Sequence, residues 1–185
     1  LLPMYLALCH AGGRVPSGAR RDGMIAYLAS TQREDGGIGL HAEDVRGSLF
    51  CTALAYVGLR ILGLPPDDPR VTRMRTFIHA NGSPLGAASW GKLVLAVLGL
   101  YDWDGLHPTL PELWVLPYSA PFHPGRMWCH CRQVYLPMAW LSGRKPVVPA
   151  DDLIRALREE LYGGEWERIR WRDHRDTVAA CDSYR

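Results

Sequence analysis

Apolar residues recur at helical spacing in segment after segment of this 185-residue chain. In residues 46–62 they form one broad face, made of Leu49, Phe50, Ala53, Leu54, Val57 and Ile61. Gly63 and two prolines then end the pattern, because proline cannot continue a helix. Similar patterns predict helices over 2–9, 19–31, 69–80, 89–100, 125–141 and 151–161, and a last one over 177–181. We find no strand-like alternation, so the sequence predicts an all-α fold of paired helices.

The predicted helix over 89–100 is apolar nearly all round, and Lys92 is its only charged residue. Such a helix is expected to be buried on several sides, with Ser89 as its N-cap. Trp90 lies in the first turn. It could be an ordinary core residue, or it could point into a cavity.

Five prolines fall within residues 108–124, which predicts an extended strap with at most one helical turn near Glu112 to Trp114. We expect this strap to lie across helices and to pack through Leu113, Trp114, Val115, Leu116, Tyr118 and Phe122. Pro137 should kink the helix over 125–141, and Gly143 should end it. The charge-rich segment 168–176 is predicted to be solvated.

The composition excludes several classes of function. A net charge of +2 gives no case for nucleic-acid binding, and 48% hydrophobic with 22% charged residues is typical of a globular domain. The five cysteines show no disulfide-framework spacing, which indicates free thiols in a reducing compartment. The first residue is not methionine, and we expect the chain to be part of a longer protein.

Cys129, His130 and Cys131 suggest a metal site at first sight. Neighbouring residues on a helix point about 100° apart, so these three cannot converge on one ion. No sequence-separated Cys or His pair completes a zinc site, and we expect no metal. The same geometry argues against a Cys–His nucleophile pair. If the residues before Cys129 are not helical, Trp128 and His130 could both reach a cavity, where His130 is either a base or a satisfied core residue.

The run His123-Pro124-Gly125-Arg126-Met127-Trp128-Cys129-His130-Cys131-Arg132-Gln133-Val134-Tyr135-Leu136-Pro137-Met138 resembles the signature of the oxidosqualene cyclases. The resemblance covers nearly the whole chain and includes Asp35-Gly36-Gly37, Ser89-Trp90-Gly91-Lys92 and Pro111-Glu112-Leu113-Trp114. The unit Tyr27, Gln32, Gly36 and Ile38 resembles the Gln-Trp structural repeat of that family, with Ile38 in the place of Trp.

The resemblance implies a terpenoid cyclase/prenyltransferase-like α/α-barrel, of which residues 1–185 form part of one domain. The catalytic acid of the family lies in an Asp-Cys-Thr-Ala-Glu motif that this chain lacks, so we expect the chain alone to be inactive. The implied enzyme is an isomerase that uses no cofactor. It cyclises (3S)-2,3-oxidosqualene through carbocations to lanosterol or cycloartenol, and it is monotopic on the endoplasmic reticulum or another intracellular membrane.

The resemblance also implies roles for single residues. Trp90, Trp128 and His130 should line the substrate cavity, with His130 as the catalytic group that accepts or relays the final proton. Cys131 and Tyr135 should border the passage by which the substrate arrives. Two alternatives remain at this point: a squalene cyclase, and a non-enzymatic α/α-barrel module that binds an isoprenoid.

Overall fold

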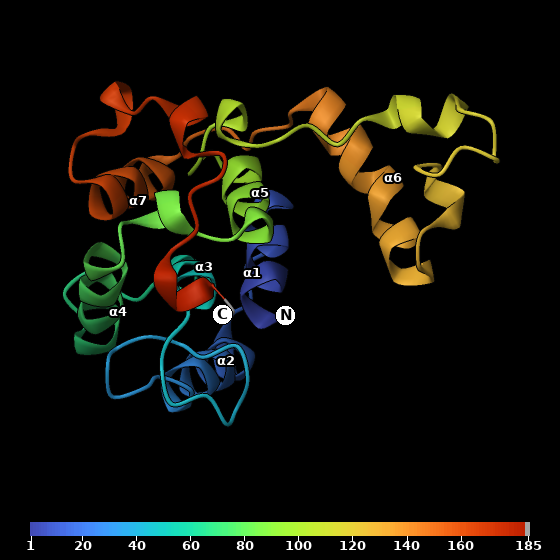
Figure 1. Cartoon of the computed structure of the whole chain (residues 1–185). Coiled ribbons are helices and arrows are strands. Elements are labelled where there is room, and N and C mark those ends of the chain that lie inside the picture. The colour runs from blue at the N-terminus through green and yellow to red at the C-terminus, as the bar shows by residue number, and fades with distance from the viewer. Residues whose placement is uncertain (184–185) are drawn as a thin grey trace.

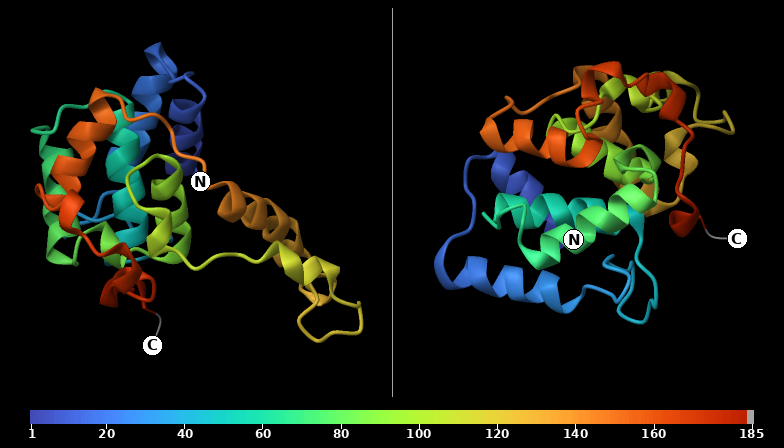
Figure 2. Two further views of the ribbon diagram at one scale, coloured as in Figure 1. Left: turned by 90° about the horizontal axis from the view of Figure 1, so that it is seen from above. Right: turned by 90° about the vertical axis from the view of Figure 1, so that its left-hand side faces the viewer.

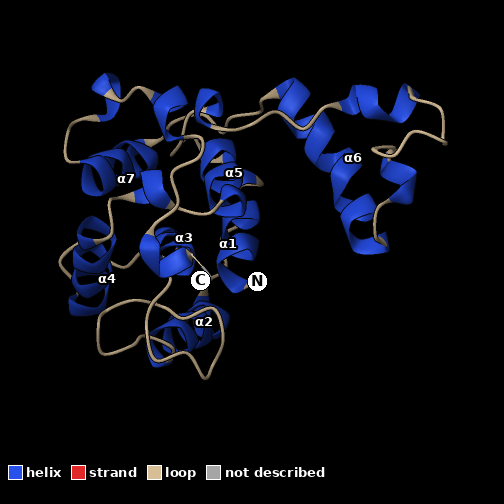
Figure 3. Ribbon diagram, viewed as in Figure 1, coloured by secondary structure: helices blue, strands red, loops and turns tan. Residues whose placement is uncertain are grey.

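A computed structural model describes residues 1–183, and these residues are helical without a β-strand (Figure 3). The described part contains seven α-helices: α1 (Leu2–Ala11), α2 (Gly18–Ser30), α3 (Leu49–Ile61), α4 (Pro69–Ala80), α5 (Ser89–Val97), α6 (Cys129–Arg144) and α7 (Asp152–Tyr162). Short 3-10 turns join them, among them η3 (Pro111–Val115) and η4 (Pro124–Arg126). The all-α prediction is confirmed. Among the described residues, no helix is both long enough and apolar enough to cross a bilayer.

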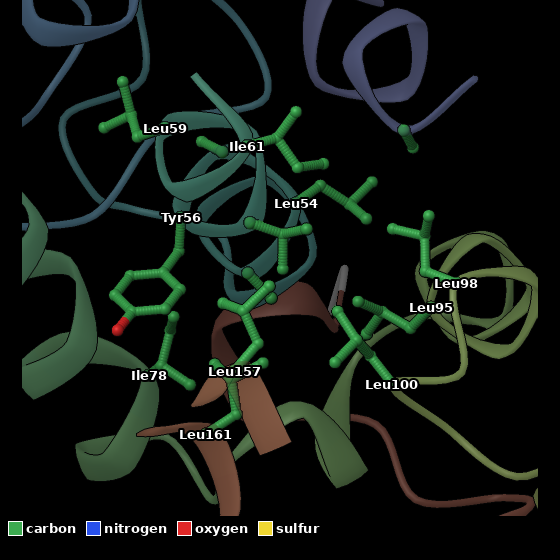
Figure 4. Packing of buried hydrophobic residues seen from close by; sticks show 14 of the residues in the cluster. Leu54, Tyr56, Leu59, Ile61, Ile78, Leu95, Leu98, Leu100, Leu157 and Leu161 are labelled. Carbon is green, nitrogen blue, oxygen red and sulfur yellow. The ribbon is translucent and has the colours of Figure 1, made fainter. Parts of the chain in front are cut away.

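Helix α3 is the centre of the core, because α1, α2, α4, α5 and α7 all pack against it. Its apolar face carries fully buried Leu49, Ala53 and Leu59. Leucines from α5 and α7 point toward the same region (Figure 4). The apolar face that the sequence predicts for residues 46–62 is therefore the surface of α3 against which the other core helices pack.

A buried polar network joins α3 to α7. Tyr56 Oη donates to Glu160 Oε2 at 2.6 Å, and Arg60 Nη2 donates to Glu160 Oε1 at 2.8 Å. The side chains of Arg60 and Glu160 are each only 11% exposed. Burial, followed by the hydrogen bond to Glu160, raises the pKa of Tyr56 well above its usual value. The network fixes which part of α7 faces α3, and its partners lie too far apart in the chain for a sequence pattern to reveal them.

A turn over residues 32–38, which begins at Gln32, links α2 to α4. Gln32 Nε2 donates to the main-chain oxygens of Gly36 at 2.9 Å and of Arg70 at 3.0 Å. Gly36 has φ +88°, a left-handed conformation that favours glycine. Ile38 is buried and pairs with Gln32 and Ser48 in isolated β-bridges, whereas Tyr27 is exposed. Gln32 and Gly36 thus hold the turn together, and Tyr27 lies outside this contact.

Residues 108–144 form an arm that projects from the helical core (Figures 1 and 2). The strap contains one short helix, η3, as predicted, but residues 117–123 fold into successive turns rather than an extended chain. It lies along α6, where Thr109 N donates to Ser142 Oγ at 3.3 Å and Tyr135 Oη donates to Leu110 O at 2.7 Å. The prediction that its apolar residues pack is only partly confirmed: Trp114 and Tyr118 contact the His123 ring and Leu113 is half-buried, whereas Val115, Leu116 and Phe122 are exposed.

Several predicted helix boundaries were wrong for local reasons. Helix α3 begins at Leu49 because the bridge between Ile38 and Ser48 keeps Ser48 extended. Ser89 is the first residue of α5 rather than its cap, and Ala88 precedes it. The predicted helix over 177–181 is only a 3-10 turn, Ala180–Asp182.

Helix α6 begins and ends later than predicted. It begins at Cys129 because η4 forms a separate turn, in which the His123 side chain accepts from Gly125 N. It continues through Gly143 to Arg144, where Lys145 takes a left-handed conformation with φ 46°. Pro146 follows at once and prevents further helix.

Candidate active site

Trp128 and His130 form an aromatic pair at the start of α6. Trp128 is the N-cap residue and has φ −54° and ψ 145°, so it lies outside the helix. This confirms the condition under which both side chains could reach a cavity. Their ring centroids are 4.3 Å apart, with an interplanar angle of 84°. Trp128 is 68% exposed, and His130 is exposed as well. The pair therefore presents an indole and an imidazole side by side on the surface of the arm.

The turn that leads to this pair is built around His123. His123 is buried, and its ring meets the edges of Trp114 and Tyr118, with centroids 5.7 Å and 5.3 Å away. Its Nδ1 accepts from Gly125 N at 3.0 Å. A Cβ at Gly125 would lie 2.8 Å from the Tyr118 ring, so only glycine fits there. The sequence offered no reason to assign His123 a role, although Pro124 after it is a signal for the first residue of a helical turn.

Cys131 and Tyr135 lie on the following turns of α6. Cys131 is exposed. The hydroxyl of Tyr135 is bound to Leu110 O, and burial, followed by the charge of Glu112, raises the pKa of Tyr135. Tyr135 is therefore a neutral hydrogen-bond donor that fastens the strap to α6. Arg132 connects α6 to the preceding turn η4, because its Nη1 donates to Gly125 O at 3.4 Å.

Trp90 lies on the core, in the first turn of α5, and is 44% exposed. It is not an ordinary core residue. Lys92, two residues later, is only 2% exposed. The structure places Trp90 on the core and the Trp128–His130 pair on the arm, and residues 1–183 show no ring contact between the two places. This portion of the chain also shows no cluster of three or more His, Cys, Asp or Glu side chains suited to hold a metal.

The sequence model of the squalene-hopene cyclase N-terminal domain matches residues 5–183 of the chain. The chain belongs to this cyclase family. It is 45% identical to the cycloartenol synthase of Dictyostelium discoideum, over all of this chain and 26% of that protein. It is 46% identical to the human lanosterol synthase, over all of this chain and 25% of that protein. The lanosterol synthase of Saccharomyces cerevisiae is 40% identical over 98% of this chain and 26% of its own length.

Family membership confirms the predicted fold class, an all-helical domain of the α/α-barrel type. It also confirms the resemblance to the oxidosqualene cyclases on which the site residues were predicted. The chain spans about a quarter of the length of the curated relatives that it matches. The roles of Trp90, Trp128, His130, Cys131 and Tyr135 stay predictions.

Proposed function

We propose that this chain is part of an oxidosqualene cyclase, an isomerase of sterol biosynthesis. The complete protein would convert (3S)-2,3-oxidosqualene to a tetracyclic sterol precursor, lanosterol or cycloartenol. The observation that carries the proposal is identity of 40–46% to cycloartenol and lanosterol synthases over all or nearly all of the chain. In this proposal residues 1–185 supply part of one domain, and the acid that opens the epoxide lies in another part of the protein.

The exposed indoles have the chemistry that polyene cyclisation requires. A carbocation is attracted to the negative face of an aromatic ring, and the ring does not trap it as a carboxylate would. Trp90 and Trp128 each offer such a ring at a surface of the chain. We assign both to the wall of the substrate cavity, where the rest of the protein must exclude water so that the cation is not quenched.

His130 is the candidate proton acceptor. An imidazole can take a proton near neutral pH, and the last step of the cyclisation releases one. The edge-on contact with Trp128 holds the His130 ring beside the indole that would face the cation. We therefore assign His130 to the removal or relay of the final proton.

Cys131 and Tyr135 are assigned to the passage by which the substrate arrives. The hydrogen bond from Tyr135 to Leu110 O ties the passage to the strap, so that motion of the strap would move the tyrosine. The substrate is a hydrocarbon with a single epoxide and partitions into bilayers. We therefore propose that the complete protein is bound peripherally, as a monotopic enzyme, to the endoplasmic reticulum or another intracellular membrane.

The test is product analysis of the complete protein carrying His130→Ala. We expect lower turnover of 2,3-oxidosqualene, a changed set of products, or both, because the final proton lacks its acceptor. His107→Ala is the control, since His107 is an exposed histidine on the core that pairs with Asp176. Wild-type products at the wild-type rate from His130→Ala would refute the role of His130.

A further inference from the structure

Two residues of helix α5, Trp90 and Lys92, have the opposite exposure from the one that hydrophobicity favours, while Leu93, Leu95 and Ala96 are buried in the ordinary way. Trp90 and Lys92 are two residues apart, so they point about 200° away from each other around the helix axis. Burial normally favours the indole inside and the ammonium in water. Here Trp90 is 44% exposed and Lys92 is 2% exposed. Val94 and Val97, which follow Trp90 at helical spacing, are only partly buried. An outward apolar stripe therefore stands opposite the helix's only charge, which points inward.

Three main-chain carbonyl groups account for the inward position of Lys92. Its Nζ donates to the oxygens of His174 at 2.6 Å, Arg175 at 3.3 Å and Thr177 at 2.8 Å. An ammonium group has three N–H donors, so these carbonyls can take the place of its hydration shell. Among residues 1–183, Lys92 forms no ion pair with a carboxylate. The predicted solvated segment is thus bound through its main chain to a buried charge.

The segment that supplies the carbonyls is held in place independently of Lys92. Arg175 Nε donates to Asp104 O at 2.8 Å, and Ala179 N donates to Gly86 O at 2.8 Å. Further along, Asp182 accepts from Ser48 Oγ at 2.6 Å and from Phe50 N at 2.8 Å, at the start of α3. These bonds hold the carbonyl groups in place without the lysine, so the carbonyl groups can determine where it points.

Gly91, between the two residues, fixes how close α5 comes to α3. A Cβ there would lie 2.8 Å from Phe50 Cδ2. This close approach requires glycine on the side of α5 that faces Phe50, so it restricts both the separation of the two helices and the rotation of α5. The bound ammonium adds a second restraint on rotation, at the face that carries Lys92, and a buried polar group can specify one arrangement in this way.

We propose that Lys92 is a positioning residue, which fixes the rotation of α5 so that Trp90 faces outward toward the isoprenoid substrate. The orientation of Trp90 rests on the geometry of this chain alone. The substrate that Trp90 faces rests on the proposed function.

The orientation is tested by fluorine NMR on the complete protein labelled with 5-fluorotryptophan. The Trp90 resonance is the one that Trp90→Phe removes, and its shift between H2O and D2O reports exposure. Lys92→Met should move this resonance and reduce its solvent shift, because the stripe can then turn inward. Lys92→Arg, which keeps the charge and the donors, should preserve it. Lys145→Met is the matched control, since Lys145 is an exposed lysine.

An unchanged Trp90 resonance in folded Lys92→Met would overturn the proposal. If Lys92→Met does not fold, Lys92→Gln takes its place, because its shorter neutral amide meets at most two of the three carbonyls. The same reduction in solvent shift is then expected, and a wild-type resonance overturns the proposal equally.

Turnover of 2,3-oxidosqualene provides a second readout through a double-mutant cycle. Lys92→Met should lower turnover about tenfold or more, because a misplaced wall residue alters the fold of the substrate. In the Trp90→Phe background the same change should cost about twofold or less, since the two residues act as one unit. An equal loss in both backgrounds would mean that Lys92 has a general structural role, and would refute its positioning role. Absence of cyclisation by the wild-type protein would refute the proposed function, while the NMR result would still decide the orientation.

Discussion

Replacing Glu160 by alanine should loosen the contact between α3 and α7 far more than any nearby surface change. The substitution leaves the Tyr56 hydroxyl without its acceptor and Arg60 without its carboxylate. Arg60 retains a bond to the main-chain oxygen of Leu64, but its side chain is only 11% exposed. Leaving one partner of a buried pair uncompensated costs about 3–5 kcal/mol. We expect the free energy of local opening to fall by about that amount.

Hydrogen exchange of the α3 and α7 amides in the complete protein measures this opening free energy locally. At about 1.4 kcal/mol per power of ten, exchange should accelerate by about two to three and a half powers of ten. Glu159→Ala is the matched control, because Glu159 is the neighbouring glutamate on α7 and is exposed. It should change the opening free energy by about 0.5 kcal/mol or less.

A double variant tests whether the unpaired buried charge causes the destabilisation. Arg60→Met with Glu160→Leu removes both charges together, and it should recover most of the lost stability because no buried charge remains unpaired. Equal exchange rates in Glu160→Ala and Glu159→Ala would refute the reasoning, since they would show that the network does not hold the two helices together.

Three further changes test the turn between α2 and α4 and the start of α4. Gly36→Ala should destabilise the protein by about 1–3 kcal/mol in thermal melting, because its φ is +88° and the added Cβ would lie 2.7 Å from a main-chain oxygen of α4. Gly143→Ala, with open space around its Cβ position, should not destabilise it. Gln32→Leu should cost about 1–2 kcal/mol in the same assay, since two carbonyl oxygens lose their donor; an unchanged melting temperature would remove Gln32 from the account of the turn. The hydrogen bond from Arg70 lowers the pKa of Asp68 to about 2 from 3.8, so its stabilising effect is complete above the ordinary pKa and is lost as pH falls toward about 2. Asp68→Asn should lose less stability than the wild type over that acid range, by about 1 kcal/mol or less, and a pH series of melts would detect this difference. An unaltered acid profile would contradict the assignment.

The sequence predicted the seven α-helices because each carries its own periodicity and its own stop signal. Their boundaries were wrong where a local bridge or turn intervenes, as at Ser48 and at η4. Contacts with distant residues were also missed. Asp182 binds Phe50 N at the start of α3, and Lys92 binds the carbonyl groups of a segment more than eighty residues later. No local pattern indicates such a partner. Residues 168–176 are exposed or half-buried, in line with their predicted solvation, but their main-chain contact with Lys92 could not be foreseen.

The candidate site was predictable to a different degree at each residue. Trp128 and His130 could be named from the family resemblance, but the non-helical turn before Cys129 that lets both rings face one side was not foreseen, because the sequence predicted helix from residue 125. The arm itself could not be foreseen. Its exposed apolar side chains read in the sequence as core residues, and their sequence contains no sign of whether a neighbour covers them. The exposure of Trp90 and the burial of Lys92 could not be foreseen either, since hydrophobicity alone suggests the opposite arrangement.

The most direct test of the central claim is product analysis of the complete protein in a host that lacks its own oxidosqualene cyclase. Cell extracts would be supplied in parallel with (3S)-2,3-oxidosqualene and with squalene. The account predicts lanosterol or cycloartenol from the epoxide. Conversion of squalene but not of the epoxide, or conversion of neither substrate, would contradict it.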